Sequence, residues 1–277
     1  MASSIKNQPK DHWSSEAYST SAAFVPKLAQ TLLRYLDPKP TDRVLDIGCG
    51  DGKFTEGFLS HVENVLGIDS SPSMIETANK DYAGEKADFR VVDCCYLEQD
   101  SAVADGTWDK VVSNAALHWI LRNEATRMST LKGAYASLKP GGTFVFEMGG
   151  HGNVSEVSTA LMSALLRQGV PIEKVREVNP WFFPSETWMT DALESIGFKV
   201  VKMETEYRPT KLTSSVNGGL EGWVRLMGAP FLDALTPEQR EEAVREVCEV
   251  LQTAVTRVED GSQWLGYVRL RGIAQKV

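Results

Sequence analysis

Cysteine is scarce in this chain: there are four in 277 residues, and no pair has the Cys-x-x-Cys spacing of zinc-binding or redox motifs. We therefore expect neither a disulfide framework nor a metal site. The sequence also lacks an apolar run long enough to span a membrane, and its first ten residues lack the basic, apolar and small-residue order of a signal peptide. These absences predict a cytoplasmic protein with no membrane partner.

Positive charge is limited as well, since 29 Lys and Arg against 37 Asp and Glu give a net charge of -8. Binding of nucleic acid requires a basic face, so we expect a small molecule rather than a nucleic acid as the partner. The length allows one large α/β domain with an added cap, or two small domains, in a monomer or a homodimer.

A glycine-rich turn follows a short apolar run at Val44–Gly52, which reads Val-Leu-Asp-Ile-Gly-Cys-Gly-Asp-Gly. This pattern predicts a buried parallel strand that breaks sharply into a helix, with glycines that let a ligand lie against the backbone. The third glycine comes one residue too early for a dinucleotide fingerprint, and Asp46 and Asp51 would repel a pyrophosphate. Both carboxylates suit a ligand with an amino group, which favours S-adenosylmethionine over NAD. A tight turn without a ligand is the alternative.

A polar residue lies at the C-terminal end of each of the next three predicted strands. Asp69 lies nineteen residues after Gly50, where a βαβ unit places a carboxylate against a ribose. Asp93 ends another short strand, either as a ligand contact or as the cap of a helix. Asn114 follows a buried strand and therefore reaches the carboxyl edge of the sheet, where open α/β sheets bind their ligands.

These segments resemble the motifs of the class I S-adenosylmethionine-dependent methyltransferases. The run Asn-Ala-Ala-Leu-His-Trp at Asn114–Trp119 is similar to the fourth motif of the trans-aconitate methyltransferase type, and Leu-Lys-Pro-Gly-Gly at Leu138–Gly142 is a frequent companion. The resemblance covers about residues 11 to 203 and the last strand. It implies an α/β fold: a Rossmann-like, seven-stranded, mostly parallel sheet with helices on both faces and a helical cap formed by insertions.

The resemblance also implies which residues contact S-adenosylmethionine. Asp93 would accept from the adenine amino group, and the backbone N–H of Cys94 would face the ring. Trp13 and Tyr18 would close over the cofactor, unless they only fix the N-terminal segment to the sheet; Met74 would touch the adenine, unless it is a core residue. The full predicted cofactor set is Trp13, Tyr18, Asp46, Gly48, Gly50, Asp69, Ser70, Met74, Asp93, Cys94 and Asn114.

Two titratable residues are candidates for catalysis, namely His118 and Glu147. An imidazole titrates near neutral pH and suits a general base. Methyl transfer from a sulfonium depends more on alignment of the nucleophile than on acid or base help, and an ionised carboxylate acceptor requires no base. His118 is therefore either a base or substrate contact, or a structural residue beside the cofactor.

The predicted organisation alternates between a core and a cap. Residues 1–40 form an N-terminal lid and helix, 41–150 the S-adenosylmethionine-binding core, 151–184 a cap segment, 185–206 core, 207–261 a helical cap insertion, and 262–277 the final edge strand of the core. The alternation of side chains in 264–274 suits an edge strand.

The cap segments are rich in aromatic residues and also carry arginines. Aromatic side chains exclude water, and arginines bind carboxylates in bidentate fashion, so this mixture fits a small organic acid. The alternative is that the aromatics pack the cap against the core and that Arg176, Arg208 and Arg225 are solvated. The predicted acceptor-binding residues are Trp119, His151, Trp181, Phe183, Trp223 and Met227.

The resemblance thus implies a methyltransferase of the trans-aconitate methyltransferase type, which moves a methyl group from S-adenosylmethionine to an oxygen, carboxylate or hydroxyl, of a small organic acid or metabolite. One alternative is methylation of carbon, nitrogen or sulfur of a secondary metabolite, with His118 or Glu147 removing a proton. Another is a protein that binds S-adenosylmethionine without catalysis.

Overall fold

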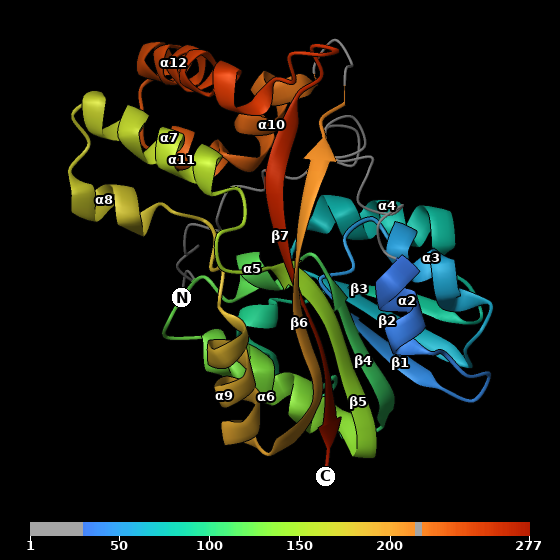
Figure 1. Cartoon of the computed structure of the whole chain (residues 1–277). Helices are drawn as coiled ribbons and strands as arrows, with labels where there is room; N and C mark the ends of the chain where they lie inside the picture. The colour runs from blue at the N-terminus through green and yellow to red at the C-terminus, as the bar shows by residue number, and fades with distance from the viewer. Residues whose placement is uncertain (1–29, 214–217) are drawn as a thin grey trace, which may run out of the picture.

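The computed structural model describes residues 30–213 and 218–277, so the predicted lid residues Trp13 and Tyr18 lie outside the described part of the chain. Its centre is a seven-stranded sheet with the order β3-β2-β1-β4-β5-β7-β6 (Figure 1). The first five strands pair in parallel: β1 (Arg43–Ile47), β2 (Asn64–Asp69), β3 (Ala87–Val91), β4 (Trp108–Asn114) and β5 (Leu138–Gly149). The predicted fold class is confirmed.

Helices cover both faces of the sheet (Figure 1), as its buried strands require. One face carries α2 (Gln30–Leu36), α3 (Lys53–Leu59) and α4 (Pro72–Tyr82), and the other carries η2 (Cys94–Gln99), α6 (Arg127–Ser137) and α9 (Glu186–Ile196). Consecutive residues of β1 show the alternation: Val44 packs with α2 and α3, whereas Leu45 packs with the η2 and α6 side. Apolar side chains are therefore needed at successive positions of β1.

The last strand, β7 (Trp264–Lys276), is not the predicted edge strand. It runs antiparallel between β5 and β6 (Phe198–Lys211), and β6 forms the edge. The prediction failed because charged residues alternate with apolar ones in Val-Arg-Leu-Arg, which is typical of a strand with one solvated face. In the fold, Arg269 and Arg271 are only 3% and 4% exposed and form ion pairs.

The two antiparallel strands extend beyond the parallel sheet and carry the cap (Figure 1). Gly149, the last residue of β5, is paired with Arg269, whereas β6 and β7 continue together as far as the pair Lys211 and Trp264. The cap has its own apolar core. Its helices are α7 (Ser155–Arg167), α8 (Ile172–Glu177), α10 (Gly219–Met227), α11 (Ala229–Leu232) and α12 (Pro237–Val255).

Within the two described ranges, no helix combines the length and the apolar character that crossing a bilayer would take.

A buried hydrogen bond joins the cap to the strands that carry it, because Trp223 of α10 donates from Nε1 to the hydroxyl of Tyr267 at 2.7 Å. We expect Tyr267→Phe to leave a buried indole N–H without this acceptor, at a cost of about 1–3 kcal/mol in unfolding free energy. Urea unfolding measures this loss. Tyr207→Phe is the matched control because Tyr207 is 68% exposed; equal losses in the two variants would contradict the prediction.

Candidate active site

Four polar side chains stand at the carboxyl ends of neighbouring parallel strands and point to one face of the sheet. Three valines of β1, β4 and β5 pack beneath α2 and α3: Val44, Val112 and Val145. Two residues after each valine, on the same face, come Asp46, Asn114 and Glu147, and Asn114 is paired with Glu147. Gly67 of β2 is paired with Asp46, so Asp69, two residues later, joins them. The predicted cofactor carboxylates therefore share one face at one edge.

The glycine turn lies beside these carboxylates and has two different uses for its glycines. Gly48 and Gly50 have positive φ angles of 72° and 55°. A Cβ on Gly48 would lie 2.2 Å from the Cβ of Ala116, whereas a Cβ on Gly50 would meet no atom within 4 Å. Gly48 therefore lets the loop after β4 approach the turn, and Gly50 leaves space in which a ligand can lie against the backbone.

Asp69 is held in place by the backbone on both sides. Its Oδ2 accepts from the N–H of Gly50 at 3.0 Å and its Oδ1 from the N–H of Ser71 at 2.9 Å. Ser71 in turn caps α4, since its Oγ accepts from the N–H of Met74. The Asp69 carboxylate is thus fixed between the turn and α4. Ser70 is exposed, while Met74 is only 5% exposed and belongs to the packing of α4.

Asp46 is the most unusual acid of the group. It is 1% exposed; Oδ2 accepts from Thr55 Oγ1 at 2.6 Å, and Oδ1 has no hydrogen-bond partner among the described residues. Burial raises the pKa of Asp46 to about 7, the hydrogen bond from Thr55 opposes this, and the charge of Asp69 adds to it. A buried acceptor without a donor fits the ammonium group of S-adenosylmethionine, so the residues present are compatible with that cofactor.

The residues predicted to face the adenine lie at the start of η2. Asp93 is exposed and caps this helix, with Oδ1 accepting from the N–H of Cys95 at 3.0 Å. Cys94 is buried, and its carbonyl accepts from Thr130 Oγ1 at 3.0 Å. Asp93 therefore has the helix-capping role that the sequence left open, and its adenine contact stays a prediction.

His118 does not suit the predicted role of general base. It lies in the short helix α5 (Leu117–Ile120), is 7% exposed, and its Nδ1 accepts from the N–H of Gly149 at 3.3 Å. Burial, followed by the charge of Arg269, lowers its pKa well below the usual value. The imidazole is therefore neutral with its proton on Nε2, and its one lone pair is already in use.

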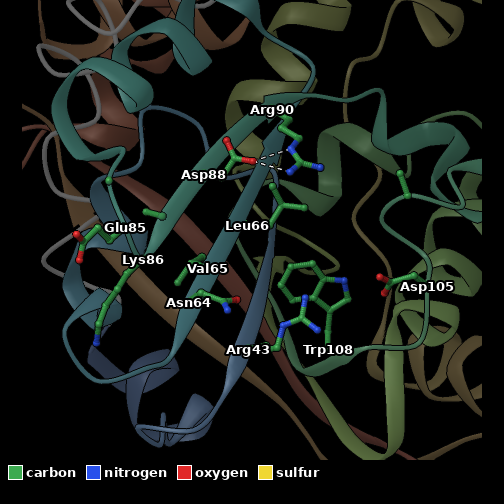
Figure 2. A pocket seen from close by; sticks show the side chains of 13 residues that line it. Arg43, Asn64, Val65, Leu66, Glu85, Lys86, Asp88, Arg90, Asp105 and Trp108 are labelled. Atoms are coloured by element: carbon green, nitrogen blue, oxygen red, sulfur yellow. Dashed lines mark hydrogen bonds and ion pairs between the residues drawn. The ribbon is translucent and has the colours of Figure 1, made fainter.

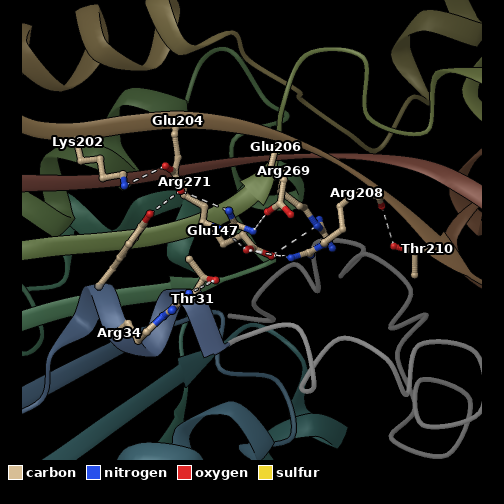
Figure 3. Close-up of polar contacts among 11 residues, drawn as sticks. Thr31, Arg34, Glu147, Lys202, Glu204, Glu206, Arg208, Thr210, Arg269 and Arg271 are labelled. Carbon is tan, nitrogen blue, oxygen red and sulfur yellow. Dashed lines mark hydrogen bonds and ion pairs between the residues drawn. The ribbon is translucent and has the colours of Figure 1, made fainter.

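Glu147 is also not available as a base (Figure 3). It is 2% exposed and contacts three guanidinium groups, those of Arg208 at 2.9 Å, Arg269 at 3.6 Å and Arg271 at 2.6 Å. Burial alone would raise its pKa, but the charges of Arg269, Arg208 and Arg271 outweigh burial and lower it. Glu147 is thus a fixed carboxylate anion whose partners oppose its protonation.

Three of the residues predicted to bind the acceptor belong instead to the core of the cap. Trp181, Trp223 and Met227 are 8%, 2% and 9% exposed and pack among the cap helices. The indole N–H of Trp223 is bonded to Tyr267. Their aromatic and apolar side chains are explained by packing, the alternative that the sequence left open.

The other predicted acceptor residues lie nearer the sheet edge. Trp119 and Phe183 are half-buried, and the ring of His118 lies 5.6 Å from each of their rings. His151 is exposed, and its backbone N–H donates to the carbonyl of Pro184 at 2.9 Å. Arg225 lies on α10 of the cap with a side chain that is 37% exposed, and it is paired with Glu221 and Glu241.

A pocket of about 310 Å³ opens at the opposite end of the strands (Figure 2). Its lining includes Arg43, Asn64 and Trp108, which begin β1, β2 and β4, and the guanidinium of Arg43 lies over the Trp108 ring. Ligands of open α/β sheets bind at the carboxyl ends of strands, so this amino-end pocket is not the candidate site.

Sequence reasoning missed three residues of the site. Thr55 is fully buried against Asp46, and a hydroxyl residue in the apolar face of α3 was the available signal. Arg269 and Arg271 were missed because they were assigned to a solvated strand face. Two arginines amid apolar residues at the end of a chain also fit buried ion pairs, which the sequence alone does not distinguish.

Comparisons with known proteins agree with this geometry. The profile of the family described as "Methyltransferase domain" matches residues 45–146. An uncharacterized methyltransferase of Schizosaccharomyces pombe is 37% identical over 268 residues, 97% of this chain and 99% of its own. A trans-aconitate 2-methyltransferase of Sinorhizobium fredii is 26% identical over 95% of this chain and 98% of its own. The crystal structure of a putative methyltransferase from Bacillus halodurans superposes with a TM-score of 0.61 at 18% identity, covering 90% and 99% of the two chains.

The fixed carboxylate of Asp69 should determine cofactor affinity. We expect Asp69→Ala to weaken binding of S-adenosylhomocysteine by about 100-fold, because two charge-assisted hydrogen bonds to a ribose are lost. Isothermal calorimetry measures the affinity. Asp88→Ala is the matched control, an acid of the neighbouring strand that is exposed and paired with Arg90. Unchanged affinity of the Asp69 variant would contradict the assignment.

The buried carboxylate of Asp46 should cost stability in the absence of ligand. Its folded pKa of about 7 exceeds the unfolded value of about 3.8, so the native state binds more protons between these values and stability falls as pH rises through this window. We expect Asp46→Asn to raise Tm by several degrees at pH 8 and hardly at pH 4, while it weakens binding of S-adenosylhomocysteine. An equal Tm change at both pH values would disprove the explanation.

Proposed function

Because the chain belongs to the class I S-adenosylmethionine-dependent methyltransferases, with S-adenosylmethionine as the methyl donor, we propose that it methylates a carboxylate oxygen of a small organic acid. The cofactor supplies an electrophilic methyl group on a sulfonium. We assign Asp69 to the ribose hydroxyls and Asp46 to the ammonium group. The cofactor would lie against the backbone of the turn at Gly50, where the turn is open. Asp93, Cys94 and Asn114 complete the proposed cofactor contacts.

The state of the two candidate bases carries the proposal for the acceptor. His118 already uses its lone pair to accept from Gly149, and Glu147 is held by three guanidinium groups. An acceptor that must lose a proton needs a group that can take it, whereas a carboxylate attacks as it stands. The chain's contribution is then to position the acceptor and to exclude water, and alignment alone supplies up to about 7–11 kcal/mol of the barrier.

The charge distribution at the edge of the sheet supports the same acceptor. Asp46 and Asp69 lie on the side of β1 and β2, and arginines of β6 and β7 surround Glu147 on the other side. A cationic cofactor suits the first half and an anionic acceptor suits the second. The relative from Sinorhizobium fredii, similar over almost its whole length, is named for a carboxylic acid. The net charge of -8 argues for a small molecule over a nucleic acid.

The proposal is tested by product chemistry. With methyl-labelled S-adenosylmethionine and a panel of organic acids, we expect S-adenosylhomocysteine to form and the label to be released as methanol in mild alkali, as from a methyl ester. Label that survives alkali would instead indicate methylation of carbon, nitrogen, sulfur or a hydroxyl group. A pure protein that binds the cofactor but transfers no methyl group to any acid would contradict the proposal.

The second test concerns the base. We expect His118→Asn, whose amide oxygen can accept from Gly149 in place of Nδ1, to change kcat by less than about threefold and to leave the pH profile unchanged, because general-base catalysis, worth about 10²–10⁴, is not in use. Stopped assays across pH 6–9 measure both quantities. A kcat loss of about 100-fold or more, with one ionisation missing from the profile, would show that His118 acts as the base.

A further inference from the structure

Four charged side chains form a buried cluster where β5 meets the overhanging strands (Figure 3). Glu147 lies on β5, Arg269 and Arg271 on β7, and Arg208 on β6. We call this group the Glu147 cluster. Arg271 has further acidic partners, since it also contacts Glu204 and Glu206 of β6. Its charge is therefore shared among several carboxylates.

Arg208 differs from Arg271 in the number of carboxylates that neutralise its charge. Its Nη2 donates to Glu147 Oε1 at 2.9 Å and its Nη1 to Oε2 at 3.4 Å, and its side chain is 13% exposed. Among the described residues, Glu147 is the one acid with which Arg208 forms an ion pair, and its buried Nε has no hydrogen-bond partner. The guanidinium thus uses its two terminal nitrogens and keeps its Nε edge unpaired.

A buried guanidinium N–H without an acceptor is unusual, because burying such a group without a partner is costly. Glu147 Oε2 already accepts from Arg208 Nη1 at 3.4 Å and from Arg271 Nε at 2.6 Å, so both of its lone pairs are in use and it does not serve the Nε of Arg208. The Nε edge of a guanidinium is one of the forks that bind a carboxylate with two parallel hydrogen bonds. The chemistry that fits this edge is a second carboxylate, supplied by a ligand.

The position of Arg208 would place this second carboxylate beside the proposed site of the carboxylate that is methylated. Glu147 is paired with Asn114 at the carboxyl end of β4, and Arg208 lies opposite Tyr267 on the part of β6 that extends past β5. The cluster therefore begins where the proposed cofactor contacts end. An acid that presents one carboxylate to the cofactor and another to Arg208 would run along this face from β4 towards β6.

We propose that Arg208 anchors a second carboxylate of the acceptor, so that the enzyme acts on di- or tricarboxylic acids in preference to monocarboxylic acids. This inference rests on the proposed carboxylate methylation. Arg208 is then a specificity-determining residue: it binds the carboxylate that is not methylated, and its guanidinium distinguishes polycarboxylates from acids with a single charge.

Three unsaturated acids with one, two and three carboxylates provide the test: crotonate, fumarate and trans-aconitate. Their affinities for the protein saturated with S-adenosylhomocysteine are measured by calorimetry, and methyl transfer is measured separately with S-adenosylmethionine. We expect the wild type to bind fumarate or trans-aconitate at least about tenfold more tightly than crotonate, as a charge-assisted bidentate contact requires. Arg208→Gln should remove this preference and change crotonate affinity by less than about threefold.

Two further variants keep the test sharp. Arg225→Gln is the matched control, since Arg225 is paired with Glu221 and Glu241 on the surface of the cap, and it should leave the preference intact. Arg208→Lys keeps a charge beside Glu147 but lacks the guanidinium fork, and should lose most of the preference. The Tm and the S-adenosylhomocysteine affinity of each variant show that it is folded; if Arg208→Gln does not fold, Arg208→Lys decides.

The outcomes separate this inference from the proposed function. A preference for polycarboxylates that survives in Arg208→Gln, or in a folded Arg208→Lys, overturns the anchor, as does a wild type that binds no polycarboxylate. Methyl esters formed equally well on fumarate and trans-aconitate by wild type and Arg208→Gln would leave the proposed function standing without the anchor. Polycarboxylate binding that depends on Arg208, but without methyl transfer, would support the anchor and overturn the proposed function.

Discussion

The carboxylate of Glu147 is the interaction on which this architecture depends. It joins β5 to β7 through Arg271 and Arg269, and to β6 through Arg208. Removing one partner of a buried ion pair leaves the other charge uncompensated, which costs about 3–5 kcal/mol, and here three guanidinium groups share one acid. These ion pairs therefore lie where β6 and β7 extend beyond β5. Because β6 and β7 carry the cap, the same ion pairs help to fix the position of the cap.

At the carboxyl ends of the strands, acidic and basic side chains lie on opposite sides of the site. Asp46 and Asp69 lie near the carboxyl ends of β1 and β2. The arginines lie on β6 and β7, and Asn114 of β4 lies between the two groups. Methyl transfer from a sulfonium to a carboxylate removes one positive and one negative charge, so a poorly hydrated site favours the reaction over the separated ions. The half-buried rings of Trp119 and Phe183 beside His118 contribute that apolar boundary.

The sequence predicts the relative placement of Asp46, Gly50 and Asp69 better than the surroundings of His118 and Glu147, for a physical reason. Asp46, Gly50 and Asp69 belong to one βαβ unit, in which spacing along the chain fixes geometry, and the fold places them together as expected. The roles of His118 and Glu147 depend instead on partners that are distant in sequence: Gly149 is 31 residues from His118, and Arg271 is 124 residues from Glu147. No local pattern indicates that a lone pair is in use or that three arginines converge on one acid. The internal position of β7 escaped prediction for the same reason, because the ion pairs that bury its arginines form with other strands.

The neutral state of His118 follows from its surroundings and agrees with the anionic acceptor proposed above. Burial and the charge of Arg269 both lower the pKa of His118, so a proton on this imidazole would add positive charge next to a cluster that already contains three guanidinium groups. Burial and Arg269, which belongs to the cluster proposed to face the acceptor, therefore also keep this imidazole from holding a proton. Such surroundings suit the proposed acceptor, which is already ionised. They do not suit an acceptor that must first lose a proton, because neither His118 nor Glu147 is available to accept that proton.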